Sequence, residues 1–274
     1  MSAVFTVCGL AALAFAAAIT LFLCLSGIPA IREIGFFKFI LGKVWNPTGA
    51  EPAYGILPFI LSSVYGTLGA VVLGVPMGIL CAAYMAKAAP RPIAAALSEA
   101  VNLLSGIPSV VYGLVGMIVL VPAVRNVFGL PDGASLFAAI LVLAIMILPS
   151  VISVSETAIK AVPREYEEGS LALGATRNET IFRVTLPAAK SGIFASAVLG
   201  TGRAIGEAMA VMMVSGNASN MPKLFKSVRF LTTAVASEMS YSSGLQRQAL
   251  FSVALVLFVF ILIINIILNA LKKR

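Results

Sequence analysis

The chain contains long stretches without a charged side chain, and these stretches limit what it can fold into. A helix needs about 20 apolar residues to cross the hydrocarbon core of a bilayer. Five stretches are longer than this, and a sixth is interrupted only by Arg203 and Glu207. The six stretches cover residues 1–31, 53–86, 100–124, 133–155, 191–222 and 248–271. The pattern predicts an all-α polytopic membrane protein with about six transmembrane helices, in contact with membrane lipid.

The composition excludes other classes of protein. Hydrophobic residues make up 60% of the 274 residues and charged residues only 11%, with a mean hydropathy of +1.03. Intrinsic disorder requires few apolar residues and many charges, so it is excluded. The net charge is +8, but the 19 basic residues are thinly spread. A nucleic-acid-binding surface gathers basic residues on one face, so we expect no nucleic-acid partner.

Cysteine, histidine and glycine patterns limit the chemistry further. The three cysteines lie inside apolar stretches without metal-ligand spacing, and the sequence has no histidine. Ser-His-Asp and Cys-His catalysis are therefore excluded, and we expect no metal site and no catalytic residue. A phosphate-binding loop of the form G-x-x-x-x-G-K-[ST] is also absent. We expect no cofactor to be bound by this chain, so energy must come from a separate subunit or an ion gradient.

The connecting segments predict the orientation in the membrane. The first apolar stretch lacks a basic leader and is longer than the core of a signal peptide, so we interpret it as a membrane helix. An even number of spans places both termini on one side. The terminal Lys272, Lys273 and Arg274 favour the cytoplasm for both ends. The long outer loop, residues 31–58, contains Trp45 and a basic amphipathic stretch at 34–44, which we expect to lie at the membrane interface.

The long loop at about residues 158–190 is cytoplasmic in this topology and contains the clearest local signals. Pro163 is suited to the first position of a helix, and Gly174 is suited to its end. Thr176 and Glu179 match a capping box that starts a second short helix, which Pro187 should end. The loop is expected to fold as a compact helix–turn–helix that serves as a binding surface.

Two ionisable residues fall inside the fifth apolar stretch. Arg203 and Glu207 are four residues apart, so a continuous helix would place them on one face with Ser196 and Gly200. A charge in the membrane centre costs about 2.5–3.5 kcal/mol, and such residues usually line a substrate path. The alternative is an ion pair that only fixes the packing of the helices.

Polar residues also form stripes in the third and fourth apolar stretches. Asn102, Ser105 and Ser109 fall on one helical face of the third stretch and continue at Tyr112, while Pro108 should break the helix. The fourth stretch has a shorter stripe of Ser150, Ser153 and Thr157. Such residues can line a path, or they can join neighbouring helices by hydrogen bonds.

The cytoplasmic loop resembles that of a known family. The loop reads Glu168-Gly169-Ser170, then Leu171, Ala172, Leu173 and Gly174, and after nine more residues Val184, one residue and Leu186-Pro187. This is similar to the permease loop of ABC importers, Glu-Ala-Ala, three residues, Gly, nine residues, Ile, one residue, Leu-Pro. The spacing agrees at every step, while Gly169, Ser170 and Val184 replace the family's residues with others of similar size.

Two further segments extend the resemblance along the chain. Residues 105–113, Ser-Gly-Ile-Pro-Ser-Val-Val-Tyr-Gly, and residues 203–211, Arg-Ala-Ile-Gly-Glu-Ala-Met-Ala-Val, resemble the permeases of phosphate-specific ABC importers. The outer-loop residues 45–47 and 55–59 are similar to the same family. The Met-Ala-Val continuation favours the PstC-type subunit over its PstA-type partner.

The resemblance implies an architecture and a set of partners. Residues 1–56 would form an N-terminal transmembrane helix and outer loop, and residues 57–274 a permease core of five helices in a bacterial inner membrane. The partners would be a PstA-type permease, an ATPase dimer that uses ATP, and an external phosphate-binding protein. Residues 168–174 with Leu186 and Pro187 would dock on the ATPase, and the substrate would be inorganic phosphate.

The substrate suggests a role for the charges in the membrane. Phosphate leaves water only when charge-assisted donors replace its hydration, and the planar guanidinium of Arg203 suits paired phosphate oxygens. Glu207 could hold Arg203 in the empty state. The alternatives are a permease for another oxyanion or solute, a proton-coupled secondary transporter with Glu207 as relay, and a component that signals phosphate status.

Overall fold

The computed structural model describes residues 2–272, so the terminal Lys273 and Arg274, used above for the orientation, lie outside the described residues. The fold is helical apart from one short antiparallel strand pair, β1 (Trp45–Asn46) and β2 (Ala53–Tyr54). The long helices are α1 (Ser2–Ile34), α3 (Leu57–Ala83), α4 (Arg91–Gly106), α7 (Leu136–Lys160), α11 (Lys190–Gly206) and α14 (Gly244–Lys272). The expected all-α membrane fold is confirmed.

Shorter elements connect these helices. They are α2 (Phe36–Leu41), α5 (Ser109–Val115), α6 (Val121–Phe128), α8 (Arg164–Ala172), α9 (Arg177–Thr180), α10 (Leu186–Ala188), α12 (Met209–Val214) and α13 (Leu231–Glu238). Three π-helical turns, η1 (Tyr84–Ala88), η2 (Gly116–Leu120) and η3 (Ile181–Thr185), join consecutive helices.

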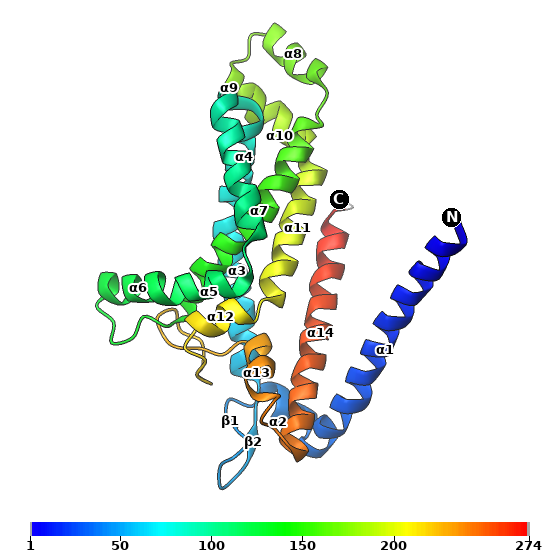
Figure 1. Cartoon of the computed structure of the whole chain (residues 1–274), viewed down its shortest axis with the longest axis vertical. Coiled ribbons are helices and arrows are strands. Elements are labelled where there is room, and N and C mark those ends of the chain that lie inside the picture. The colour runs from blue at the N-terminus through cyan, green and yellow to red at the C-terminus, as the bar shows by residue number, and fades with distance from the viewer. Residues whose placement is uncertain (1, 273–274) are drawn as a thin grey trace.

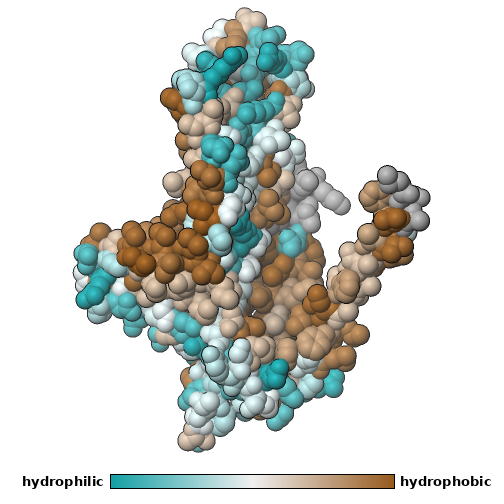
Figure 2. Space-filling view, in the orientation of Figure 1, coloured by the Kyte–Doolittle hydropathy of each residue, from teal (hydrophilic) through white to brown (hydrophobic). Residues whose placement is uncertain are grey.

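The chain is elongated, and its two ends differ in structure. Helices α3, α7, α11 and α14 run along the long axis (Figure 1). We call the end that bears α8, α9 and α10 the loop end, and the end that bears α2, β1 and β2 the hairpin end. Hydrophobic residues cover much of the surface between the two ends, while polar residues gather at the ends (Figure 2). This distribution is typical of a protein that crosses a bilayer.

Five helical segments of the described chain are long and apolar enough to span a membrane. They are Val4–Ile34, Leu57–Ala88, Ser109–Phe128, Leu136–Lys160 and Gly244–Ile267. The predicted third and fifth spans differ from this set, because neither is one continuous helix. The third divides at Ile107 and Pro108, where the backbone becomes extended, and the fifth divides at Glu207.

The bend at Pro108 is sharp. Residues before proline avoid the helical region, and Ile107 has a ψ of 127°. After the bend, the segment from α5 to α6 runs crosswise to α4 and projects from the bundle (Figure 1). The hydroxyl of Tyr112 donates to the Leu104 carbonyl across the bend at 2.7 Å. This bond satisfies one of the backbone groups that the broken helix leaves free.

The centre of the bundle is the contact between α3 and α7. A Cβ added to Gly74 would lie 2.8 Å from Ile147, and one added to Gly78 would lie 2.7 Å from Val151. The two glycines therefore let the helix backbones approach closely, as small residues do in membrane helices. Helix α1 meets α14 near the hairpin end, where Ser252 donates to the Gly27 carbonyl at 2.6 Å. From there the two helices diverge (Figure 1).

Candidate functional site

Arg203 lies in the last turn of α11, inside the apolar part of the bundle, and is half-buried. Its Nη1 donates to the Ser150 Oγ on α7 at 3.0 Å. Among residues 2–272, no carboxylate lies within ion-pair distance of Arg203. The site therefore holds a cation that no carboxylate of the described residues neutralises.

The expected pairing of Glu207 with Arg203 is wrong. Helix α11 ends at Gly206, and Glu207 is extended, with φ −73° and ψ 126°. Its Oε1 accepts from the Ala210 N–H at the start of α12 at 3.0 Å, and its carbonyl accepts from the Thr232 hydroxyl at 2.8 Å. The carboxylate thus accepts from a free N–H group at the start of α12. It does not lie on the α11 face that carries Arg203.

The expected polar face of the third stretch is also divided. Asn102 and Ser105 are exposed on α4, whereas Ser109 is the first residue of α5, beyond the bend. No hydrogen bond joins these three side chains to Arg203 within the described part of the chain. Tyr112, the next residue of that face, donates its hydroxyl to the Leu104 carbonyl. A role of the three residues in a substrate path stays a prediction.

Other polar residues on α11 hold it against α7. The hydroxyls of Ser155 and Ser196 lie 2.7 Å apart and are both fully buried. Gly200 faces Val151 so closely that an added Cβ would lie 2.9 Å from it. Ser196 and Gly200 therefore join α11 to α7. Of the fourth-stretch stripe, Ser150 is the member that contacts Arg203.

The loop end folds as the expected helix–turn–helix. Helix α8 begins after Pro163 and ends at Ala172, and Gly174 adopts a positive φ of 87° that turns the chain away. The Thr176 and Glu179 side chains form the predicted capping box at the start of α9. Hydrogen bonds from the Thr176 backbone N–H and hydroxyl hold the pKa of the Glu179 carboxyl below its ordinary value. The second helix is thus fixed at its first turn.

The tip of this helix–turn–helix exposes apolar side chains. Leu173 is 91% exposed and Leu171 is 48% exposed. Glu168, Gly169 and Ala172 are also exposed beside them. Ser170 turns inward, and its hydroxyl lies 3.0 Å from that of Thr180. The predicted docking residues therefore form a surface that a partner protein can cover.

The second helix ends close to Pro187, as expected. It runs from α9 through the π-turn η3 into α10 and ends at Ala188. Pro187 is the second residue of α10, where the wider turn removes the need for its N–H. Leu186 is half-buried and packs against the apolar cluster at the loop end.

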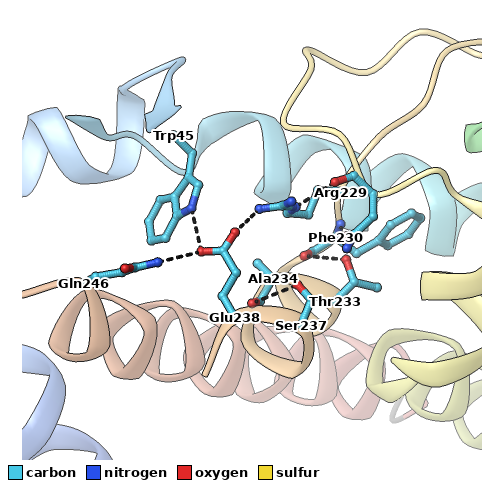
Figure 3. Close-up of polar contacts among 9 residues, drawn as sticks. Trp45, Arg229, Phe230, Thr233, Ala234, Ser237, Glu238 and Gln246 are labelled. Atoms are coloured by element: carbon cyan, nitrogen blue, oxygen red, sulfur yellow. Dashed lines mark hydrogen bonds and ion pairs between the residues drawn. The ribbon is translucent and has the colours of Figure 1, made fainter. Parts of the chain in front are cut away.

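A polar network at the hairpin end includes Trp45 and was not predictable from local sequence patterns (Figure 3). Glu238 accepts from the Trp45 Nε1 at 3.0 Å and from the Gln246 Nε2 at 3.2 Å, and it forms an ion pair with Arg229. The Arg229 guanidinium also lies 5.8 Å from the centre of the Phe59 ring. Trp45 is only 7% exposed, so its side chain packs within the protein. The expected position of the outer loop at the membrane interface stays a prediction.

No group of three or more Cys, Asp or Glu side chains in the described residues is arranged to hold a metal ion. The site thus consists of Arg203 with Ser150 within the bundle, and of the exposed helix–turn–helix at the loop end.

Comparison with known proteins identifies relatives along most of the chain. The profile of the family described as "Binding-protein-dependent transport system inner membrane component" matches residues 74–274. The chain is 38% identical to the probable ABC transporter permease protein YqgH of Bacillus subtilis, covering 98% of this chain and 89% of that protein. It is 34% identical to the phosphate transport system permease protein PstC of Pasteurella multocida, covering 81% and 75%.

Solved structures with the same fold are more distant in sequence. An inward-facing form of the MetNI methionine ABC transporter is 20% identical, with a TM-score of 0.59, and the match covers 80% of this chain and 93% of that one. An amino acid ABC transporter is 21% identical, with a TM-score of 0.57 and coverage of 80% and 92%. The fold, the loop and the sequence matches agree, and the chain belongs to the inner-membrane permease family of binding-protein-dependent ABC transporters.

Proposed function

We propose that the chain is the PstC-type permease subunit of an ATP-driven importer for inorganic phosphate. The observation that supports this substrate most directly is Arg203, which has no carboxylate partner among residues 2–272 and lies inside an apolar bundle. A guanidinium binds phosphate oxygens through paired, charge-assisted hydrogen bonds. The relatives named PstC support phosphate as the anion.

The partners follow from the same proposal. A second, PstA-type permease completes the path, an external phosphate-binding protein delivers the anion, and an ATPase dimer docks on the loop end. The exposed Leu171 and Leu173 beside Glu168 support this docking site, because a partner would cover their apolar surface. The ATPase hydrolyses ATP, and this chain contributes no catalytic residue.

The loop end faces the cytoplasm in this proposal. The first turns of α1 and the last turns of α14 lie on the same side of the hairpin end, towards the loop end (Figure 1). This arrangement supports two cytoplasmic termini in the bacterial inner membrane. The hairpin end then faces the external binding protein.

The test is reconstitution of the chain with its three partners in proteoliposomes. Radioactive phosphate should enter only when ATP, the ATPase and phosphate-loaded binding protein are all present. Excess sulfate, molybdate or arsenate should compete weakly, whereas strong competition by sulfate or molybdate would favour a permease for that oxyanion. Uptake driven by a proton gradient without the ATPase would contradict the proposal.

A further inference from the structure

One ion pair connects α8 to η1, the π-turn that continues α3. The Lys87 Nζ in η1 lies 2.5 Å from the Glu167 Oε1 in α8. The two side chains are only 16% and 23% exposed. A pair that is mostly withdrawn from water is more strongly coupled than a surface pair, and the loss of one partner leaves the other charge uncompensated.

Two further hydrogen bonds converge on this pair. The Thr185 hydroxyl in η3 donates to the same Glu167 Oε1 at 3.2 Å. The Arg177 side chain in α9 donates to the Lys87 carbonyl at 2.7 Å. Helices α8 and α9 are therefore each connected to η1 at Lys87, and η3 is connected to the pair through Glu167.

The pair joins the loop to α3, one of the two helices whose contact forms the centre of the bundle. Lys87 belongs to a π-turn that continues α3 without a break, and such turns are frequent at functional sites. Helix α3 contacts α7 closely at Gly74 and Gly78, and α7 provides Ser150, the partner of Arg203. A displacement of α8 would thus reach the helix pair that holds the cation.

The loop end also has room for a displacement. A cavity of about 520 Å³ lies beside the ion pair, lined by Lys87, Arg164, Glu167, Glu168 and Arg177 together with apolar residues. Helix α8 can shift into this space while the ion pair keeps it attached to η1.

We propose that Lys87 and Glu167 are positioning residues that transmit the movement of α8 to α3 and so link ATP hydrolysis to transport. The inference rests on the proposed function above. It differs from docking, because Lys87 and Glu167 are mostly buried and paired with each other, whereas Leu171 and Leu173 at the tip are exposed. Their loss should leave the ATPase bound but reduce the phosphate moved per ATP.

The test uses the complete complex in proteoliposomes, with uptake and ATP hydrolysis measured in the same vesicles. Lys87→Gln and Glu167→Gln should each lower the phosphate imported per ATP by roughly three- to tenfold, with the ATPase still copurifying. The exchanged pair, Lys87→Glu with Glu167→Lys, should recover at least about half of the loss. The matched control is Lys160→Gln, because it removes a 2.6 Å ion pair to Glu156 within the single helix α7.

An unchanged ratio in both single variants would overturn the inference, as would an equal loss in Lys160→Gln. Loss of ATPase copurification that the exchanged pair does not restore would also overturn it, since the role would then be structural.

Hydrogen exchange of the α8 amides gives a second readout that does not depend on the transported solute. It should become faster in Glu167→Gln, and unchanged exchange would contradict the inference even if the wild-type complex imported no phosphate. Failure of the wild type to import phosphate would count against the proposed function alone.

Discussion

The Nη1 of Arg203 donates to the Oγ of Ser150 at 3.0 Å, across the contact between α11 and α7. The two residues are 53 positions apart in the sequence. Ser150 is neutral, so the bond orients the guanidinium without cancelling its charge. An uncompensated cation in an apolar bundle is stabilised when an anion binds to it. The favourable free energy of this ion pairing contributes to substrate binding.

Arg203→Gln should abolish phosphate uptake while the complex still assembles. The amide keeps a donor for Ser150 but loses the charge, and a hydrogen bond to a charged group contributes about 1.5–3 kcal/mol. We therefore expect at least a tenfold loss of uptake in proteoliposomes with normal copurification of the partners. Ser150→Ala is the control, since it removes the orienting bond but keeps the cation, and its loss should be smaller. Uptake at the wild-type level in Arg203→Gln would assign the residue to helix packing.

Glu207 should act by accepting a hydrogen bond from the Ala210 N–H and not by carrying a proton. Glu207→Gln keeps an oxygen that can accept from the Ala210 N–H, so stability and uptake should remain close to the wild type. Glu207→Ala removes the acceptor and should destabilise the start of α12 by about 1 kcal/mol. Thermal unfolding of the purified complex measures the difference. Loss of uptake in Glu207→Gln would instead support the proton-relay alternative.

The helix–turn–helix at the loop end could be predicted from the sequence because its signals are local. Gly174 and the capping box of Thr176 and Glu179 each depend on residues within one turn, and both occur where they were expected. The end of the second helix near Pro187 was predictable for the same reason. The π-helical form of η3 within it was not, because a π-turn is not encoded by a distinct local pattern.

The residue contacts inside the bundle could not be predicted, because they join distant parts of the chain. The spacing of Arg203 and Glu207 indicated a shared helical face, but a carboxylate after Gly206 can equally accept from the next helix. Tryptophan is a residue type that is common at membrane interfaces. In this structure the Trp45 side chain is buried, and its indole N–H donates to Glu238, which is 193 residues away. Side-chain pairs at such separations leave no periodic signal in a single sequence.

Glu168→Lys should separate ATP hydrolysis from transport. Glu168 lies exposed beside the apolar tip, where a docked ATPase would remove both from water. A reversed charge at this position should weaken copurification of the ATPase and lower ATP-dependent uptake at least about tenfold. Glu165→Lys is the matched control, because Glu165 is also an exposed carboxylate of α8 but lies a turn before the tip. Normal coupling in Glu168→Lys, or equal loss in Glu165→Lys, would contradict the docking assignment.

Glu238 should hold the hairpin end together, and Trp45 provides a direct optical readout. Trp45 is the only tryptophan of the chain, and its indole N–H donates to the Glu238 carboxylate in a site that is almost closed to water. Glu238→Ala leaves Arg229 without its ion-pair partner, which costs about 3 kcal/mol for a mostly buried pair. The Trp45 emission should shift to longer wavelength as water reaches the ring, and the unfolding temperature should fall. Gln246→Ala removes only one of the three contacts of Glu238, so its shift should be much smaller. An unchanged emission spectrum in Glu238→Ala would show that apolar packing against Phe59 is sufficient to keep Trp45 buried.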